Sequence, residues 1–301
     1  MAATRFASGV RSAAADYDSC ERRCASCEIG ASNAKDPEGV TFIYRDPLKN
    51  IPKEIAAGAA ECVQRALNQR NRASKWKRFG FSTSEDAVTW VVFVHLLRSG
   101  QLGSALSACG LLSSAAADRC SLLLWGNAVD GAAGGPAIRD RLTEISFQAG
   151  EDPQSMSEPD VIVDAGPAGL VFIEVKFRSG NDNAPADYPG WMRYLREDGP
   201  FGDAALARAS GCYELARNWY FMSALANGRP ATLVNLGQGK LFSGIEGQRL
   251  ARFEQSLNGG TSQRFARLTW SQFLSGLNRA PQWSRNFCTN RGLGSRRELA
   301  T

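Results

Sequence analysis

Apolar residues recur at helical spacing in two stretches of the first third of the chain. From Pro52 to about Arg72, apolar and alanine positions fit a helix with acidic residues early and arginines late, as the helix dipole favours. Residues 82–84, Ser-Thr-Ser, precede a nearly continuous apolar segment, EDAVTWVVFVHLLRSG, that stops at Gly100. This segment predicts a helix buried on most sides, with His95 as a packed core residue.

The middle of the chain carries mainly strand signals, followed by one long helix. Strands are predicted where β-branched and aromatic residues gather, in LTEISFQAG (142–150), VIVD (161–164), GLVFIEVKF (169–177) and ATLVNLGQ (231–238). The turn residues AGPAG join the second and third of these into a hairpin. A helix is expected from about Asp203 to Asn227. A helix, three strands, a helix and a strand together predict an α/β fold with a mixed central sheet flanked by helices.

The two ends differ from this central part. Residues 1–38 are rich in alanine, serine and charge and lack aliphatic periodicity, so they are predicted to be a flexible, cysteine-containing tail. Residues 39–301 are predicted to be a single domain, in which 102–140 serve as connection and packing. Residues 239–301 form a more polar C-terminal extension with a last amphipathic helix near SQFLSGLNR.

Composition narrows the class of protein. With 301 residues, 44% hydrophobic and 22% charged, the chain can bury a full core, which excludes disorder as its main state. A single histidine excludes multi-histidine metal centres, so hydrolytic chemistry must depend on carboxylates, lysine, cysteine or water. Eight cysteines are too few for a disulfide scaffold and no apolar signal segment is visible, so a reducing cytoplasm is expected. Residues 99–117, the longest uncharged stretch, are too polar to span a bilayer, so no membrane association is expected.

A run of basic residues is suited to contact with phosphate. The net charge of +5 is mild, but the segment 65–78 holds basic residues without one acid, and Trp76 lies among them. These residues are Arg65, Arg70, Arg72, Lys75, Lys77 and Arg78. A solvated helix face produces the same pattern, so a nucleic-acid-binding surface and a plain exposed face both remain open.

The predicted hairpin gathers the charged groups that could carry chemistry. Side chains two residues apart on a strand point the same way, so Glu174 and Lys176 share one face, and the hairpin brings Asp160 alongside. Two carboxylates and an ammonium in an apolar sheet are costly to bury, and a bound cation relieves that cost. Magnesium prefers one or two carboxylates together with water and phosphate oxygens. Asp160 and Glu174 are therefore candidate metal ligands, with Lys176 beside the attacking water.

Pro159-Asp160, followed after thirteen residues by Glu174-Val175-Lys176 on an apolar strand, resembles the motif of the PD-(D/E)XK nuclease superfamily. The resemblance covers roughly residues 82–238 and implies a restriction-endonuclease-like fold with an αβββαβ-type core. It implies a nuclease that hydrolyses phosphodiester bonds with Mg²⁺ or Mn²⁺, acting on nucleic acid, most simply DNA, and sometimes as a homodimer. In that family the aspartate and glutamate hold the metal, and the lysine, which unlike arginine can lose its proton, orients or activates water.

The same resemblance implies an additional acid on an upstream helix, and Glu85 matches it. Ser82-x-x-Glu85 also fits a capping box, in which the glutamate only satisfies a backbone amide, so both roles stay open. Glu144 is a second candidate for the extra acid. Arg178, in the loop after the active strand, is a candidate phosphate contact, and the E-x-K triplet could instead be a structural ion pair.

Three cysteines near the N-terminus form a separate candidate site. Cys20-x3-Cys24-x2-Cys27 has the spacing of a zinc or iron–sulfur half-site, but a fourth ligand is not evident and free thiols explain the pattern equally. Three functions therefore remain: an active nuclease, a catalytically silent nucleic-acid-binding protein of the same fold, and a cysteine–metal protein. The intact Asp160, Glu174 and Lys176 set favours the first.

Overall fold

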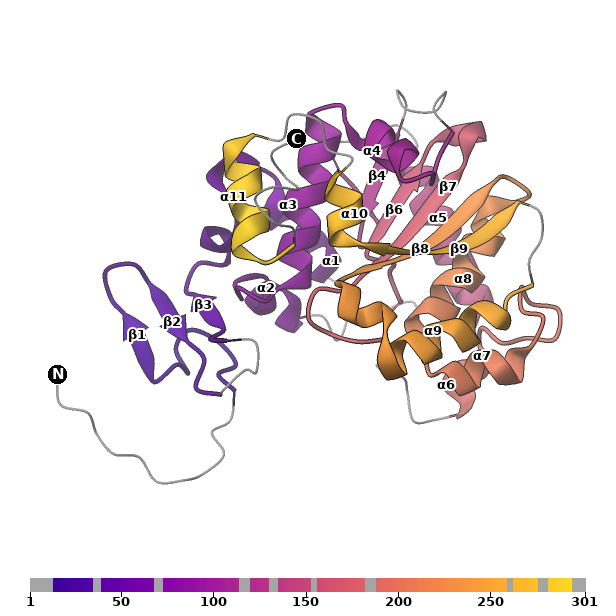
Figure 1. Ribbon diagram of the computed structural model, residues 1–301, viewed down its shortest axis with the longest axis horizontal. Helices are drawn as coiled ribbons and strands as arrows, with labels where there is room; N and C mark the ends of the chain where they lie inside the picture. The colour runs from indigo at the N-terminus through magenta and orange to yellow at the C-terminus, as the bar shows by residue number, and fades with distance from the viewer. Residues whose placement is uncertain are drawn as a thin grey trace.

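A six-stranded mixed sheet with helices on both faces forms the centre of the computed structural model (Figure 1). The structure describes residues 13–34, 39–67, 73–113, 120–129, 135–152, 156–181, 188–258, 262–275 and 281–293. In sheet order the strands are β5 (Asn127–Ala128), β4 (Ser121–Leu124), β6 (Val161–Asp164), β7 (Leu170–Val175), β8 (Ala231–Gly237) and β9 (Gln263–Thr269). The pairs from β5 to β7 are antiparallel, and β7–β8 and β8–β9 are parallel. The α/β class with a mixed sheet is therefore confirmed.

Helices cover the sheet in two layers (Figure 1). One layer contains α1 (Ala59–Leu67), α2 (Ala73–Phe79), α3 (Glu85–Arg98), α4 (Leu102–Ala108), α10 (Trp270–Ser275) and α11 (Gln282–Asn290). The other contains α5 (Gly135–Gln148), α6 (Tyr188–Met192), α7 (Ala204–Ser210), α8 (Tyr213–Ala226) and α9 (Gly244–Gln255). Both faces of the sheet are apolar and are covered by helices, as strand β7 shows. Its residues Val171 and Ile173 belong to the core under the first layer, and Leu170 and Phe172 belong to the core under the second. Short 3-10 turns lie at Pro47–Asn50, Lys53–Ile55, Gly166–Ala168 and Gly239–Phe242.

The predicted helix after residues 82–84 is present as α3. Ser84 caps it by accepting a hydrogen bond from the Ala87 amide at 3.2 Å, and every residue from Ala87 to Leu96 is buried. His95 packs edge-to-face against Trp283, which confirms it as a core residue. The helix places its acidic first turn, Glu85 and Asp86, at the end of the sheet where β6 begins and β7 ends.

Three predictions about helices and strands are wrong. Residues 142–150 belong largely to helix α5, because Ile138, Leu142 and Ile145 recur every three or four residues on its buried side. The first strand of the central group is instead β4, within the segment 102–140 that the sequence predicts to be a connection. Residues 203–227 form two helices, α7 and α8, because Gly211 adopts a left-handed conformation (φ 73°) that ends α7.

The N-terminal segment has secondary structure where a flexible tail was expected. Strands β1 (Arg22–Cys24), β2 (Ile29–Ala31) and β3 (Phe42–Tyr44) form a small antiparallel sheet. Buried Cys20 and Ile43 supply its apolar contacts, and Ile43 bridges to Phe81 of the main body. Strands of three residues are too short to show apolar alternation in a sequence, which is why the pattern missed them. Residues 1–12 and 35–38 of the predicted tail lie outside the described residues.

Among the residues that the structure describes, none of the helices is both long and apolar enough to cross a bilayer.

Candidate functional site

Asp160 and Glu174 lie opposite each other on neighbouring antiparallel strands. The register Val161↔Ile173 places Asp160, the residue before β6, across from Glu174 of β7. Side chains in opposite positions share a face, with Cβ atoms about 5 Å apart. The Asp160 Oδ2 atom also accepts a hydrogen bond from the Val175 amide at 3.0 Å, which fixes its carboxylate at the end of β7. The structure therefore brings together the two acids that the motif singled out.

Lys176 and Asn218 occupy both oxygens of Glu174. The Lys176 Nζ atom lies 2.8 Å from Oε1, and the Asn218 side-chain amide donates to Oε2 at 2.7 Å. Glu174 and Lys176 are 3% and 5% exposed, so this ion pair is largely shielded from water. The shared face that the i,i+2 spacing predicted is present.

Helix α8 supplies two groups that sequence reasoning missed. Glu214 accepts a hydrogen bond from Lys176 Nζ at 2.5 Å, and Asn218 holds Glu174 as described. The two residues are four apart, so they lie on one side of the helix. The signal that could have found them is this pair of polar residues on a buried helix face, where Asn218 has no exposed surface.

Burial and neighbouring charges both shift the pKa values of these residues. Burial and the nearby charge of Glu174 raise the pKa of Asp160 well above its usual value, and burial also raises the pKa of Glu174. Burial opposes the charged form of Lys176, but the carboxylates of Glu174 and Glu214 outweigh it and raise the lysine pKa. Lys176 is therefore held as an ammonium ion. It can orient water and neutralise charge, but it is not a base that loses its proton at neutral pH.

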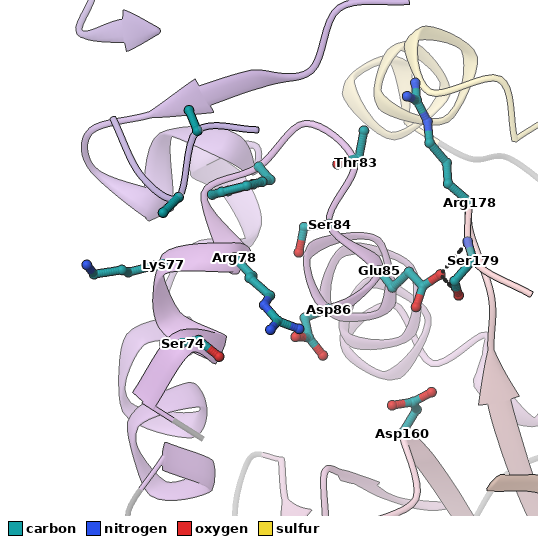
Figure 2. A pocket seen from close by; sticks show the side chains of 13 residues that line it. Ser74, Lys77, Arg78, Thr83, Ser84, Glu85, Asp86, Asp160, Arg178 and Ser179 are labelled. Carbon is teal, nitrogen blue, oxygen red and sulfur yellow. Dashed lines mark hydrogen bonds between the residues drawn. The ribbon is translucent and has the colours of Figure 1, made fainter. Parts of the chain in front are cut away.

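Glu85 connects the start of α3 to the end of β7. Its Oε1 atom accepts a hydrogen bond from the Phe177 amide at 2.7 Å. It also accepts from the Ser179 hydroxyl at 2.7 Å and the Ser179 amide at 3.3 Å (Figure 2). The capping box with Ser82 is not formed, because Ser84 is the N-cap and Glu85 is the first residue of the helix. The structure thus places Glu85 beside the site, as a group that fixes the exit of the active strand. Glu144, by contrast, is exposed on α5 and pairs with Arg141.

A cavity of about 720 Å³ opens over Asp160. Asp160 and Asp86, an acid that sequence reasoning did not single out, point into it from the sheet and from α3, while α2 contributes Lys77 and Arg78 (Figure 2). Arg178 lines it from the loop after β7, near Ser179. Three of the predicted phosphate contacts, Lys77, Arg78 and Arg178, therefore border one cavity with a candidate metal ligand.

The other predicted contacts do not line this cavity among the described residues. Lys75 pairs with Asp86 at 3.0 Å and lies over the Trp125 ring, 4.7 Å from the ring centre. Arg65 pairs with Glu61 on α1, and Arg70 and Arg72 fall outside the described residues. Lys77 is also paired, with Asp16 of the N-terminal segment at 2.9 Å.

Asp160 and Glu174 are the candidate ligands for a hard divalent cation, which prefers carboxylate oxygens. Burial first and the charge of Glu174 second raise the pKa of Asp160, and a cation between the two acids would remove the second of these effects. Among the described residues, no group of three or more histidine, cysteine or acidic side chains is placed to share one metal ion. The remaining ligands would therefore be water and substrate phosphate oxygens, as is usual for magnesium.

Cys20, Cys24 and Cys27 do not converge as a half-site. Cys20 is buried and its Sγ atom donates to the Asp16 carbonyl at 3.4 Å, while Cys24 and Cys27 are exposed. Gly30 packs against Cys20, since a Cβ at that position would lie 2.7 Å from the sulfur. The sulfur of Cys20 thus belongs to the small core of the N-terminal sheet.

Replacing Glu85 tests its structural role. We expect Glu85→Ala to lower the free energy of unfolding by about 1–3 kcal/mol, because it leaves the Phe177 and Ser179 amides without their acceptor. Urea unfolding measures this change. Glu61→Ala is the matched control: the Glu61 side chain is 74% exposed and pairs with Arg65, so we expect a change within about 0.5 kcal/mol. Equal effects in both variants would contradict the role given to Glu85.

Comparison of the chain with protein-family models, with curated proteins and with solved structures found no match. The chemistry of the site must therefore be inferred from its own residues and their geometry.

Proposed function

We propose that this chain is a metal-dependent nuclease that hydrolyses phosphodiester bonds in DNA, in a reducing cytoplasm. One observation carries the proposal: Asp160 and Glu174 lie opposite each other at the end of two paired strands, with the Lys176 ammonium 2.8 Å from Glu174. Asp160 lines a cavity that Lys77, Arg78 and Arg178 also border, and Glu174 and Lys176 are buried beside it. Two carboxylates and an ammonium next to such a cavity suit the binding of a metal ion and a phosphate.

The arrangement of elements supports the same proposal. Helix α3, strands β4, β6 and β7, helix α8 and strand β8 occur along the chain in the αβββαβ order expected of a restriction-endonuclease-like core. The pairing of these strands is antiparallel, antiparallel and then parallel. Further elements lie between them: α4 after α3, β5 and α5 after β4, and α6 and α7 after β7. We therefore propose that this is the fold of the chain, and that Asp160, Glu174 and Lys176 are its catalytic residues.

Each side chain has a separate role in the proposed reaction. Asp160 and Glu174 would hold the divalent ion, which when bound would supply Lewis-acid chemistry and a more acidic water. Lys176, fixed by Glu174 and Glu214, stays positively charged and stabilises negative charge as it develops on the phosphate. Arg178 and Arg78 border the cavity and contact flanking phosphates. Glu85 keeps the segment that carries Arg178 in place through Ser179.

Incubation of the purified protein with linear, circular and single-stranded DNA tests the proposal. We expect cleavage with Mg²⁺ or Mn²⁺ and none with EDTA. Incubation with RNA of the same sequence shows whether cleavage requires deoxyribose. A folded protein that binds DNA but cuts none of these substrates with either metal would contradict the proposal.

That last outcome would instead support a catalytically silent nucleic-acid-binding protein. One observation favours this second candidate: Lys176 is engaged by Glu214 as well as by Glu174, so its ion pairs are complete without substrate. Electrophoretic mobility shifts with the same DNA, measured in EDTA, separate binding from cutting.

A further inference from the structure

The turn between β1 and β2 presents two cysteines on the surface. Cys24 ends β1 and Cys27 lies in the turn that follows, and both side chains are exposed. The Glu28 amide donates to the Cys24 carbonyl at 2.9 Å and closes the turn, with Glu28 in a left-handed conformation (φ 56°). The Glu28 carboxylate is held by Lys49 at 2.6 Å and by Arg45 at 3.4 Å. The hydrogen bond between Glu28 and Cys24 and the two ion pairs of Glu28 therefore hold this turn in place.

The sulfur of Cys24 is in contact with Ser26, whose hydroxyl lies 3.2 Å from Sγ. Hydrogen bonding from Ser26 first, and from Cys27, lowers the pKa of Cys24 to about 6. At neutral pH Cys24 is mostly a thiolate, which is the form that attacks disulfides.

The other thiols of the described residues have the opposite environment. Burial raises the pKa of each of them, namely Cys20, Cys62, Cys109, Cys120, Cys212 and Cys288. Cys109 and Cys120 are half-buried and the other four are buried, and protonated thiols shielded in this way react slowly with disulfides. Thiol reactivity is thus concentrated at the β1–β2 turn.

We propose that Cys24 and Cys27 form a redox-active dithiol that closes to an intramolecular disulfide by exchange with a small-molecule disulfide such as glutathione disulfide. The geometry allows it, because a tight turn brings the Cα atoms of residues three apart within about 7 Å, and a disulfide requires a Cα separation of about 4.4–6.8 Å. This site is independent of the proposed nuclease chemistry.

The exchange has two steps. The Cys24 thiolate attacks one sulfur of glutathione disulfide, so a Cys24–glutathione mixed disulfide forms and one glutathione thiolate leaves. Cys27 then gives its proton to water, and its sulfur attacks Cys24 Sγ, releasing the second glutathione thiolate. Starting from the Cys24 thiolate, the protein loses two electrons and one proton, and glutathione disulfide is reduced to two glutathione thiolates. One of these takes up the proton released by Cys27 and the other takes up a proton from water.

Peptide mass spectrometry tests the proposal on the intact, folded chain. The protein is equilibrated in glutathione buffers from fully reducing to fully oxidising, alkylated under denaturing conditions and digested with trypsin, which yields a peptide of residues 24–35 whose only cysteines are Cys24 and Cys27. We expect this peptide to lose two hydrogens and both alkyl groups in oxidising buffer, and to regain them in reducing buffer. Peptides with the buried cysteines should remain alkylated throughout.

Single substitutions give the second test. Cys27→Ser should accumulate glutathione on Cys24, because the resolving thiol is absent, and Cys24→Ser should react at least about tenfold more slowly at Cys27. Cys109→Ser is the matched control and should close the disulfide as the wild type does. Persistent alkylation of Cys24 and Cys27 in oxidising buffer would overturn the proposal. So would co-purified zinc that is lost in both turn variants, since the pair would then be a metal ligand.

Discussion

Asp160→Asn is expected to abolish metal-dependent DNA cleavage, by at least about 10³-fold, while leaving the metal-free protein at least as stable as the wild type. The neutral amide binds a divalent ion poorly, and a metal ion contributes several kcal/mol to a phosphoryl transition state, at about 1.4 kcal/mol for each factor of ten in rate. The amide oxygen can still accept from the Val175 amide, so the strand pairing is kept. Initial cleavage rates and urea unfolding in EDTA measure the two effects.

The stability effect depends on pH with a definite sign. The folded state raises the pKa of Asp160, through burial first and the Glu174 charge second, so the folded protein binds this proton more tightly than the unfolded chain does. The resulting stabilisation is complete below the unfolded pKa of about 3.9 and is lost as pH rises through the folded pKa. In EDTA the wild type should therefore lose stability over that range, and Asp160→Asn should lack this part of the pH dependence.

Asp164→Asn is the matched control on the same strand. Asp164 pairs with Arg229 at 2.9 Å and accepts from the Gly166 amide at 2.9 Å, at the end of β6 away from the site. We expect this variant to lose up to about 1 kcal/mol of stability and to keep its cleavage rate. Equal cleavage by Asp160→Asn and the wild type, or loss of cleavage in both variants, would contradict the role of Asp160.

Lys176→Met is expected to reduce the free energy of unfolding by about 3–5 kcal/mol. The substitution leaves Glu174 and Glu214 facing each other without the ammonium that lies 2.8 Å and 2.5 Å from their oxygens. Removing one of these acids as well should recover part of the loss, so Lys176→Met with Glu214→Gln should be more stable than Lys176→Met alone. Urea unfolding of the three proteins at neutral pH measures both changes.

Lys49→Met controls for the loss of a lysine ion pair. Lys49 lies 2.6 Å from Glu28, but its side chain is 48% exposed, so we expect a cost below about 1 kcal/mol. Two results would contradict the described arrangement of Glu174, Lys176 and Glu214. One is a loss of stability in Lys176→Met no larger than that in Lys49→Met, and the other is a further loss when Glu214→Gln is added to Lys176→Met. The double variant, which should fold, is also the suitable protein for asking whether cleavage requires the ammonium, and we expect its cleavage to be lost.

The part of the site that lies on β6 and β7 could be predicted from the sequence. Strand alternation and a short turn determine which residues share a face, so the pattern was sufficient to place Asp160, Glu174 and Lys176 together. The start of α3 could also be predicted, because Ser84 and the acids after it are a local helix-start signal. The role of Glu85 could not, since its partners Phe177 and Ser179 are reached only through the fold.

Groups brought in by tertiary packing were missed. Glu214 is 38 residues from Lys176 in the chain, and its contact depends on how α8 crosses the sheet. Short apolar runs were also ambiguous: the segment 121–124 is a strand and the segment 142–148 is the end of a helix, although both are brief and rich in apolar residues. Only the longer period of Ile138, Leu142 and Ile145 distinguishes the helix.

Titration with Mn²⁺, followed by the electron paramagnetic resonance signal of the free ion, tests most directly the claim that Asp160 and Glu174 together hold a divalent cation. The wild type and Asp160→Asn are titrated side by side at neutral pH, with Asp164→Asn as the control. The wild type and Asp164→Asn should bind an ion that Asp160→Asn does not bind, and Mg²⁺ should compete for it. Identical binding curves for all three proteins would contradict the metal site on which the proposed nuclease depends.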